Sequence, residues 1–180
     1  MASWAKMARR WRVPLSFAMA AAALYLAQPT RLSIAVGAGF SLAGLALRAV
    51  ASGHIDKDVR LAVTGPYAYT RHPLYLGSVL IALGFVAAAR SEWVALAVCA
   101  LFLAFYLPMI AAEEDYLRAT FTGYAEYAAS VPRFGLRATP YAARPGEARA
   151  RFSRELYLWH REYNAVLCCL VMFGALLLKL

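Results

Sequence analysis

The sequence predicts an all-α fold, in which one domain forms a polytopic bundle of about five transmembrane helices. Three observations support this prediction. The 180 residues are 62% hydrophobic and only 16% charged, which is more apolar than a typical soluble domain. The apolar residues form five separate runs rather than amphipathic stripes. Lys and Arg concentrate on one side of these runs, as they do in membrane proteins.

The first two runs, 13–27 and 32–51, are predicted to form a helical hairpin. A basic segment precedes the first run, and this pattern is also typical of a signal peptide. We favour a transmembrane helix, because the second run begins almost at once after a proline-containing turn at 28–31. The second run is about twenty residues long, enough to cross a bilayer. Its small residues would allow a neighbouring helix to approach closely.

A polar loop, 52–74, separates this hairpin from the third and fourth runs, 75–89 and 93–112. Pro108 lies near the end of the fourth run, and it predicts a kink there. The segment 113–130 has apolar and aromatic residues at helical spacing. We expect it to form a helix that lies on the membrane surface or covers a site.

The last apolar run, 163–178, follows a segment rich in Arg, Pro and Ala. It is short for a transmembrane span, and the segment 156–159 could lengthen it. Cys99, Cys168 and Cys169 lie in apolar runs without metal-ligand spacing, so we interpret them as packing residues. No metal site is predicted.

The distribution of basic residues predicts an orientation. Five spans would place fifteen Lys and Arg residues on one side and three on the other. The basic side carries the N-terminus, 52–74 and 113–162, so these segments should face the cytosol. The net charge of +9 then matches an anionic membrane leaflet, and no nucleic-acid partner is predicted. We expect an integral protein of the bacterial inner membrane, with a motif core at 52–134 and a basic C-terminal part with the last span at 135–180. Its oligomeric state does not follow from the sequence.

The segment 65–77 carries the densest group of chemically active residues. It holds two glycines, two prolines, three tyrosines, Arg71 and His72, directly before an apolar run. The Gly-Pro turn lets the backbone approach a ligand, and Arg71 suits a carboxylate. Pro73 fits the first turn of a helix, which places His72 at the positive end of that helix. The alternative interpretation is an interfacial anchor, because aromatic residues are common at membrane surfaces.

Three acids, Glu113, Glu114 and Asp115, follow the fourth run. Acidic residues at a helix start interact favourably with the helix dipole, which is the simpler interpretation. On the arginine-rich side they would also suit a cationic ligand, and spacing does not decide between Glu113 and Glu114. The sequence has no Ser-His-Asp, zinc-ligand or paired-acid pattern, so a water-activating hydrolase is not predicted.

Two blocks of this sequence together resemble a known family. The first is Gly65-x-Tyr67-x-x-x-Arg71-His72-Pro73-x-Tyr75-x-Gly77, and the second is Glu113-Glu114-x-x-Leu117-x-x-x-Phe121, followed by Tyr124-x-x-Tyr127-x-x-x-Val131-Pro132. Their order and spacing resemble the isoprenylcysteine carboxyl methyltransferase family and, more broadly, membrane phospholipid methyltransferases. The resemblance covers roughly residues 52–134.

The resemblance implies S-adenosylmethionine as the methyl donor and a lipophilic acceptor, such as an isoprenylcysteine-like carboxylate, that arrives from the bilayer. It implies a cofactor pocket at the cytosolic side of the bundle. His72, Arg71 and Glu113 are the candidate catalytic residues. The residues implied to bind the cofactor are Val59, Arg60, Leu61, Ala62, Tyr67, His72, Pro73, Leu74, Tyr75, Glu113 and Glu114.

Two positions depart from the family pattern. Met109 stands where eukaryotic members have a substrate-binding arginine, and the segment from Phe121 to Tyr124 is one residue shorter than usual. The first departure makes the acceptor an open question. The alternatives are a phospholipid headgroup N-methyltransferase, a sterol-type reductase with a nicotinamide cofactor, and a non-enzymatic membrane scaffold. A scaffold should tolerate replacement of both His72 and Glu113.

Overall fold

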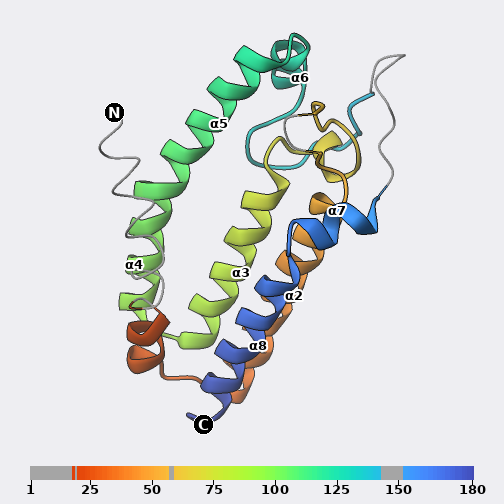
Figure 1. The fold of residues 1–180 in the computed structure, drawn as a ribbon. Coiled ribbons are helices and arrows are strands. Elements are labelled where there is room, and N and C mark those ends of the chain that lie inside the picture. The colour runs from red at the N-terminus through yellow and green to blue at the C-terminus, as the bar shows by residue number, and fades with distance from the viewer. Residues whose placement is uncertain (1–17, 19, 57–58, 143–151) are drawn as a thin grey trace.

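The computed structural model describes residues 18, 20–56, 59–142 and 152–180, and every regular element in these ranges is helical (Figure 1). The basic N-terminal segment lies outside the described residues, as does much of the first predicted run. Residues 20–26 of that run are helical. The choice between a first span and a signal peptide therefore stays a prediction.

The described helices follow the predicted order of apolar runs. The long elements are α2 (Arg31–Ser52), α3 (Pro73–Ala89), α4 (Glu92–Leu101), α5 (Leu107–Thr120) and α8 (Tyr163–Leu177), and the short ones are η1 (Gly65–Ala68), η2 (Phe102–Tyr106), α6 (Tyr124–Ser130) and α7 (Arg154–Trp159).

Helix α2 begins where the proline-containing turn was predicted. Thr30 Oγ1 accepts a hydrogen bond from the Ser33 amide at 3.2 Å, and the Ser33 hydroxyl accepts one from the Thr30 amide at 2.9 Å. This reciprocal pair is a capping box, which satisfies two amides that the helix itself cannot pair.

Helices α2 and α3 pack side by side along their length (Figure 1). A Cβ atom added to Gly37 or Gly44 of α2 would collide with the backbone oxygen of Gly84 or Gly77 of α3. The predicted small residues of the second run therefore bring the two backbones into contact, as small residues do between membrane helices.

Helix α8 runs beside α2, and an ion pair ties it there (Figure 1). Arg48 donates from Nε and Nη2 to the two carboxylate oxygens of Glu162, both at 2.9 Å. Helix α7 does not lengthen α8, as 156–159 was expected to do. Arg161 between them has a left-handed φ of 53°, which ends the helical path.

Helices α4 and α5 form one continuous helix, Glu92–Thr120, joined by the π-helical segment η2. The π turn lies directly before Pro108, which has no N–H to donate to the preceding turn. Pro108 was predicted to kink this helix, and a π turn is the irregularity that accompanies it. Because α5 continues from α4, Glu113, Glu114 and Asp115 lie inside a helix. The helix-dipole interpretation of these acids is therefore wrong.

The prediction of one helix over 113–130 is also wrong. Helix α5 ends at Thr120, Phe121 is extended with φ −118° and ψ 114°, and α6 begins only at Tyr124. The expected apolar contacts still form, because Tyr124 and Tyr127 pack with Val63 and Val131, against Leu117 and Phe121. Tertiary packing around the turn thus replaces the predicted helical face.

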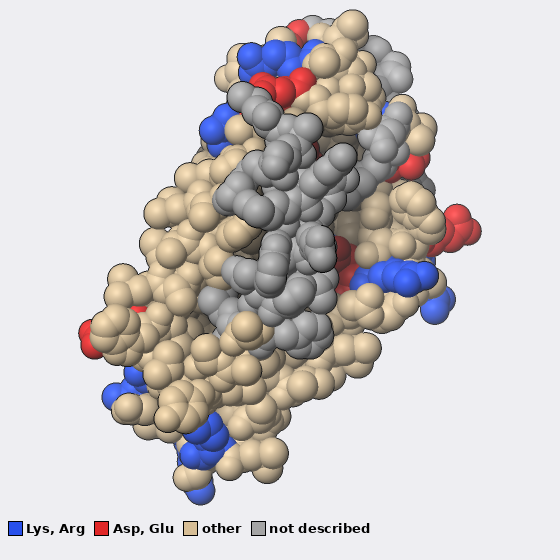
Figure 2. Space-filling view, turned by 60° about the vertical axis from the view of Figure 1, so that its left-hand side comes forward, with Lys and Arg blue, Asp and Glu red and all other residues tan. Residues whose placement is uncertain are grey.

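Two described helices, α2 and the continuous Glu92–Thr120, are long and apolar enough to cross a membrane, whereas α3 and α8 are apolar but shorter. Large apolar side chains point outward from them; Leu170 and Val171 of α8 are 64% and 71% exposed. Figure 2 shows that uncharged residues cover most of the described surface on the face drawn, with charged ones mainly near its two ends and at its edges. Such a large exposed apolar surface is typical of a membrane protein.

Candidate functional site

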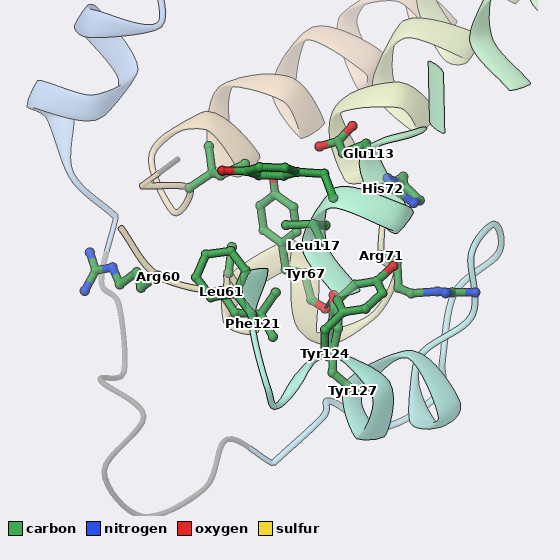
Figure 3. A pocket seen from close by; sticks show the side chains of 13 residues that line it. Arg60, Leu61, Tyr67, Arg71, His72, Glu113, Leu117, Phe121, Tyr124 and Tyr127 are labelled. Carbon is green, nitrogen blue, oxygen red and sulfur yellow. Dashed lines mark hydrogen bonds between the residues drawn. The ribbon is translucent and has the colours of Figure 1, made fainter. Parts of the chain in front are cut away.

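The site lies at the end of the bundle where η1, α5 and α6 meet (Figures 1 and 3). The chain turns into η1 at Gly65, whose φ of +62° suits glycine, and the His54 ring occupies the space that a Cβ would need. The Tyr127 hydroxyl donates a 2.7 Å hydrogen bond to the Tyr67 carbonyl. This buried bond fixes η1 against α6.

Glu114 forms the charged centre of the site. Its Oε1 accepts from His72 Nε2 at 3.0 Å and lies 3.1 Å from Arg71 Nη1. Arg133 contacts both oxygens, with Nε 3.1 Å from Oε1 and Nη2 close to Oε2. The Glu114 and His72 side chains are only 4% and 3% exposed. A buried carboxylate requires such partners, because desolvation of an unpaired charge is costly.

The contact with Glu114 assigns the proton on the His72 ring. An ionised carboxylate only accepts hydrogen bonds, so Nε2 carries the hydrogen and Nδ1 is the basic atom of the neutral ring. Burial lowers the pKa of His72, although its hydrogen bond to Glu114 acts in the opposite direction. The imidazole is therefore neutral at physiological pH.

A cavity of about 170 Å³ lies beside this cluster (Figure 3). Glu113 and His72 lie toward one end of the group of lining side chains, and Tyr124 and Tyr127 lie toward the other. Apolar side chains form much of the wall between them, including Leu61, Leu117 and Phe121.

Three buried polar atoms that belong to cavity residues have no hydrogen-bond partner among the described residues. They are the hydroxyls of Tyr67 and Tyr124 and Nε of Arg71. Burial, and secondarily the charge of Glu113, raises the pKa of Tyr67, so its hydroxyl keeps its proton. Unpaired buried polar groups are unfavourable, so these three atoms are available to bound water or to a polar ligand in the cavity.

Some of the predicted site residues line this cavity and others do not. The lining residues are Arg60, Leu61, Ala62, Tyr67, Arg71, His72 and Glu113. Val59 is 72% exposed, and Pro73, Leu74, Tyr75 and Glu114 are absent from the lining. Glu113 and Glu114 are thereby distinguished, because only Glu113 faces the cavity.

Tyr75 belongs to a neighbouring aromatic group instead. Its ring lies 5.6 Å from that of His72 and 5.6 Å from that of Tyr106, both edge-on. The Leu74 carbonyl accepts a hydrogen bond from Arg48, and Pro73 forms the buried first turn of α3. These residues contact His72 and the α2–α3 pair and do not line the cavity.

Several lining residues were not assigned to the site from sequence: Ile55, Tyr116, Leu117, Phe121, Tyr124 and Tyr127. The helical spacing of the last four was visible, but it was interpreted as one face of a helix that lies on the membrane surface or covers a site. The Val-Pro-Arg-Phe block was also visible, yet nothing in its spacing connected Arg133 with Glu114.

Part of this sequence, including most of the cavity residues, matches known proteins. Residues 49–123 match the model of the phospholipid methyltransferase family. The cobalt-zinc-cadmium resistance protein CzcN of Cupriavidus metallidurans is 35% identical over 85 residues, which cover 47% of this chain. The chain spans only 39% of the length of that relative. No solved structure shows a significant match.

The matched residues include both predicted blocks as far as Phe121, and they contain His72, Glu113 and Glu114. They end just before α6 and Arg133. The predicted resemblance to membrane phospholipid methyltransferases is therefore confirmed over residues 49–123.

Proposed function

We propose that this chain is an S-adenosylmethionine-dependent methyltransferase that acts on a lipophilic acceptor at the cytosolic face of a membrane. About five spans would anchor it, with the N-terminus and the motif loops in the cytosol of a bacterium. The observation that carries the proposal is the cavity between Glu113 and Tyr124. It lies within or next to the family-matched residues and holds buried polar groups that lack partners in the described chain.

The residues around the cavity fit the chemical groups of S-adenosylmethionine. Glu113 suits its ammonium, and Arg71 Nε with the Tyr124 hydroxyl suits its carboxylate. Leu117 and Phe121 offer apolar walls for the adenine. The aromatic rings of Tyr67 and Tyr116 suit a sulfonium cation. At about 170 Å³, the cavity is smaller than pockets that enclose whole ligands. The proposal therefore requires the half-exposed wall at Tyr116 to open when the cofactor enters.

When bound, the cofactor supplies a methyl group activated by a sulfonium. The chain's own task is to orient donor and acceptor and to exclude water. A carboxylate acceptor has no proton to lose and needs no base. If the acceptor is an amine or a thiol, His72 is the candidate base, because its Nε2–H is engaged by Glu114 while Nδ1 is basic. Its neutral state, favoured by burial, is the state that a base needs.

Two acceptor classes are consistent with this site. The first is an isoprenylcysteine-like carboxylate or a related small lipid. The second is the amine headgroup of a phospholipid, which Met109 favours because this position carries no cation to pair with an acceptor carboxylate. A protonated amine would also be attracted by the aromatic rings of Tyr75 and Tyr106.

Transfer of a tritiated methyl group from S-adenosylmethionine to extracted bacterial lipids tests both the activity and the acceptor class. The protein is reconstituted in vesicles of these lipids, with Gly39→Ala as a fold control and Glu113→Gln as the site variant. A methyl ester releases volatile methanol in alkali, whereas an N-methyl group stays on the lipid. Incorporation by wild type and Gly39→Ala, but not by Glu113→Gln, is expected. Equal incorporation by all three proteins would contradict the assigned site.

A further inference from the structure

Arg133 reaches the site from outside the family-matched residues. It follows α6 in the segment Pro132–Phe134, whose backbone is bound to the motif loop: the Arg71 amide donates to the Pro132 carbonyl at 3.0 Å. The Thr70 hydroxyl lies 3.4 Å from the Arg133 carbonyl. Farther along, the Arg137 amide donates to the Tyr69 carbonyl at 3.0 Å, and the Tyr141 amide donates to the Ala68 carbonyl at 2.9 Å.

The Arg133 guanidinium engages both oxygens of Glu114, whereas His72 and Arg71 share a single oxygen, Oε1. A forked contact of this kind fixes the plane of a carboxylate as well as its position. The direction in which Oε1 faces His72 is therefore set by a residue that does not line the cavity itself.

The same segment also touches His72 directly. The centre of the Phe134 ring lies 6.4 Å from that of the imidazole. The Tyr75 ring packs edge-on against the same imidazole, with the ring centres 5.6 Å apart. The imidazole is thus held by a hydrogen bond to Glu114 and by two aromatic rings, and one ring comes from the segment that carries Arg133.

We infer that Arg133 is a positioning residue: by clamping Glu114, it holds His72 as the Nε2–H tautomer with Nδ1 available as the base. The inference rests on the proposed function for the catalytic meaning of that base. The tautomer and the clamp can be tested without any methyl transfer.

The charges around His72 predict the direction in which its pKa should shift when one of them is removed. The groups that face it are Glu113 and Glu114 from α5, Arg71 from the motif loop, Arg133 from the segment after α6, and Tyr75 from α3. Removal of the Arg133 charge leaves Glu114 less neutralised, so the pKa of His72 should rise. Removal of the Glu114 charge should lower the pKa of His72 and release its tautomer.

The experiment is a pH titration of the imidazole nitrogens by NMR, on protein labelled with ¹⁵N in histidine and embedded in nanodiscs. The chain has three histidines, and His72→Gln identifies the signals of His72. The variants are Arg133→Met, Arg133→Lys and Glu114→Gln. Arg137→Met is the matched control, because it alters a basic side chain of the same segment and leaves the backbone bond to Tyr69 possible.

In wild type, we expect the Nε2–H tautomer of His72. Arg133→Met should shift the pKa of His72 upward, Arg133→Lys should largely restore it, and Arg137→Met should leave it unchanged. Arg133 is about half exposed, so these variants should fold even if Glu114→Gln does not. Arg133→Met should also let the second neutral tautomer of His72 appear, because the plane of Glu114 is no longer fixed. An unchanged tautomer or an unchanged pKa in Arg133→Met would overturn the inference, as would an equal shift in Arg137→Met.

Failure of the inference and failure of the proposed function are distinguishable. If wild type does not bind S-adenosylmethionine but His72 responds to Arg133→Met as described, the proposed function fails and the clamp stands. If wild type binds the cofactor but the pKa and tautomer of His72 do not change in Arg133→Met, the clamp fails and the proposed function stands.

Discussion

The α2–α3 pair and the cavity end of the bundle use small and polar residues in opposite ways. Between α2 and α3, glycines bring the backbones together, and the few polar side chains find partners across the interface. Ser33 donates to the Ala88 carbonyl at 3.1 Å, and the Ser41 hydroxyl lies 3.4 Å from the Ile81 carbonyl. At the cavity end, two tyrosine hydroxyls and an arginine nitrogen are buried without partners in the described chain.

This difference separates residues that stabilise the fold from residues whose polar groups are available to a ligand. A packed interface that satisfies its own polar groups contributes stability. Polar groups left unsatisfied are unfavourable in the free protein and are expected at functional sites. Substitutions in the two regions should therefore differ in what they change, and Glu114 marks the boundary, because it belongs to the site but is fully paired.

Replacement of Glu114 by alanine should have the largest effect on stability. It leaves Arg71 and His72 buried beside an empty space, and loss of one partner of a buried charge pair costs about 3–5 kcal/mol. Denaturant unfolding in detergent measures the loss. Asp115→Ala is the control, because Asp115 is adjacent on α5 but exposed. Equal losses for both variants would contradict the role given to Glu114.

Replacement of Gly37 by alanine should come next. The added Cβ would collide with the Gly84 oxygen of α3, and such overpacking costs about 1–3 kcal/mol. Gly39→Ala on the same helix meets nothing within 4 Å and should be neutral or stabilising, because alanine favours helices. Thermal unfolding of the pair compares them. If Gly39→Ala were the more harmful change, the close α2–α3 packing would be wrong.

Two tyrosines of α6 offer a smaller and more specific contrast. The Tyr127 hydroxyl is bound to the Tyr67 carbonyl, so Tyr127→Phe should lose about 1 kcal/mol of stability. The Tyr124 hydroxyl has no hydrogen-bond partner among the described residues, so Tyr124→Phe should leave the stability of the free protein nearly unchanged. It should instead weaken cofactor binding by about tenfold, the value of one hydrogen bond. Unfolding and binding curves for both variants test this reversal.

The smallest expected effect is a pH dependence of stability due to His72. Its pKa is lowered in the folded state from the ordinary value of 6.5, so the unfolded chain binds more protons between the two values. Stability should therefore fall as pH decreases from about 6.5 toward the lowered pKa. His72→Gln should reduce this fall. A steeper fall in His72→Gln would contradict a neutral buried imidazole.

Much of the helical framework could be predicted from the sequence, because apolar runs and proline-containing turns are local signals. The starts of α2 and α3 follow from the proline-containing turn at 28–31 and from Pro73 in this way. The break between α5 and α6 could not be predicted, because Phe121, Tyr124 and Tyr127 have helical spacing and only their packing with Val63 and Val131 reveals the turn.

The central residues of the candidate site could be predicted, but which of them line the cavity and which form the Glu114 cluster could not. His72 and Glu113 were identifiable from the two blocks. The choice between Glu113 and Glu114 depends on which way each side chain leaves α5, and adjacent residues on a helix differ there by about a quarter turn. Arg133 was invisible for another reason: its contact with Glu114 forms only when the segment after α6 folds back onto the motif loop.

The central claim is that the cavity beside Glu113 holds S-adenosylmethionine, and calorimetric titration of this cofactor into the detergent-purified protein tests it most directly. The account predicts saturable binding by wild type, with a dissociation constant of the order of micromolar, and equal binding by Gly39→Ala. Glu113→Gln, correctly folded, should lose most of this affinity. Absence of binding by folded wild type, or undiminished binding by Glu113→Gln, would contradict the account.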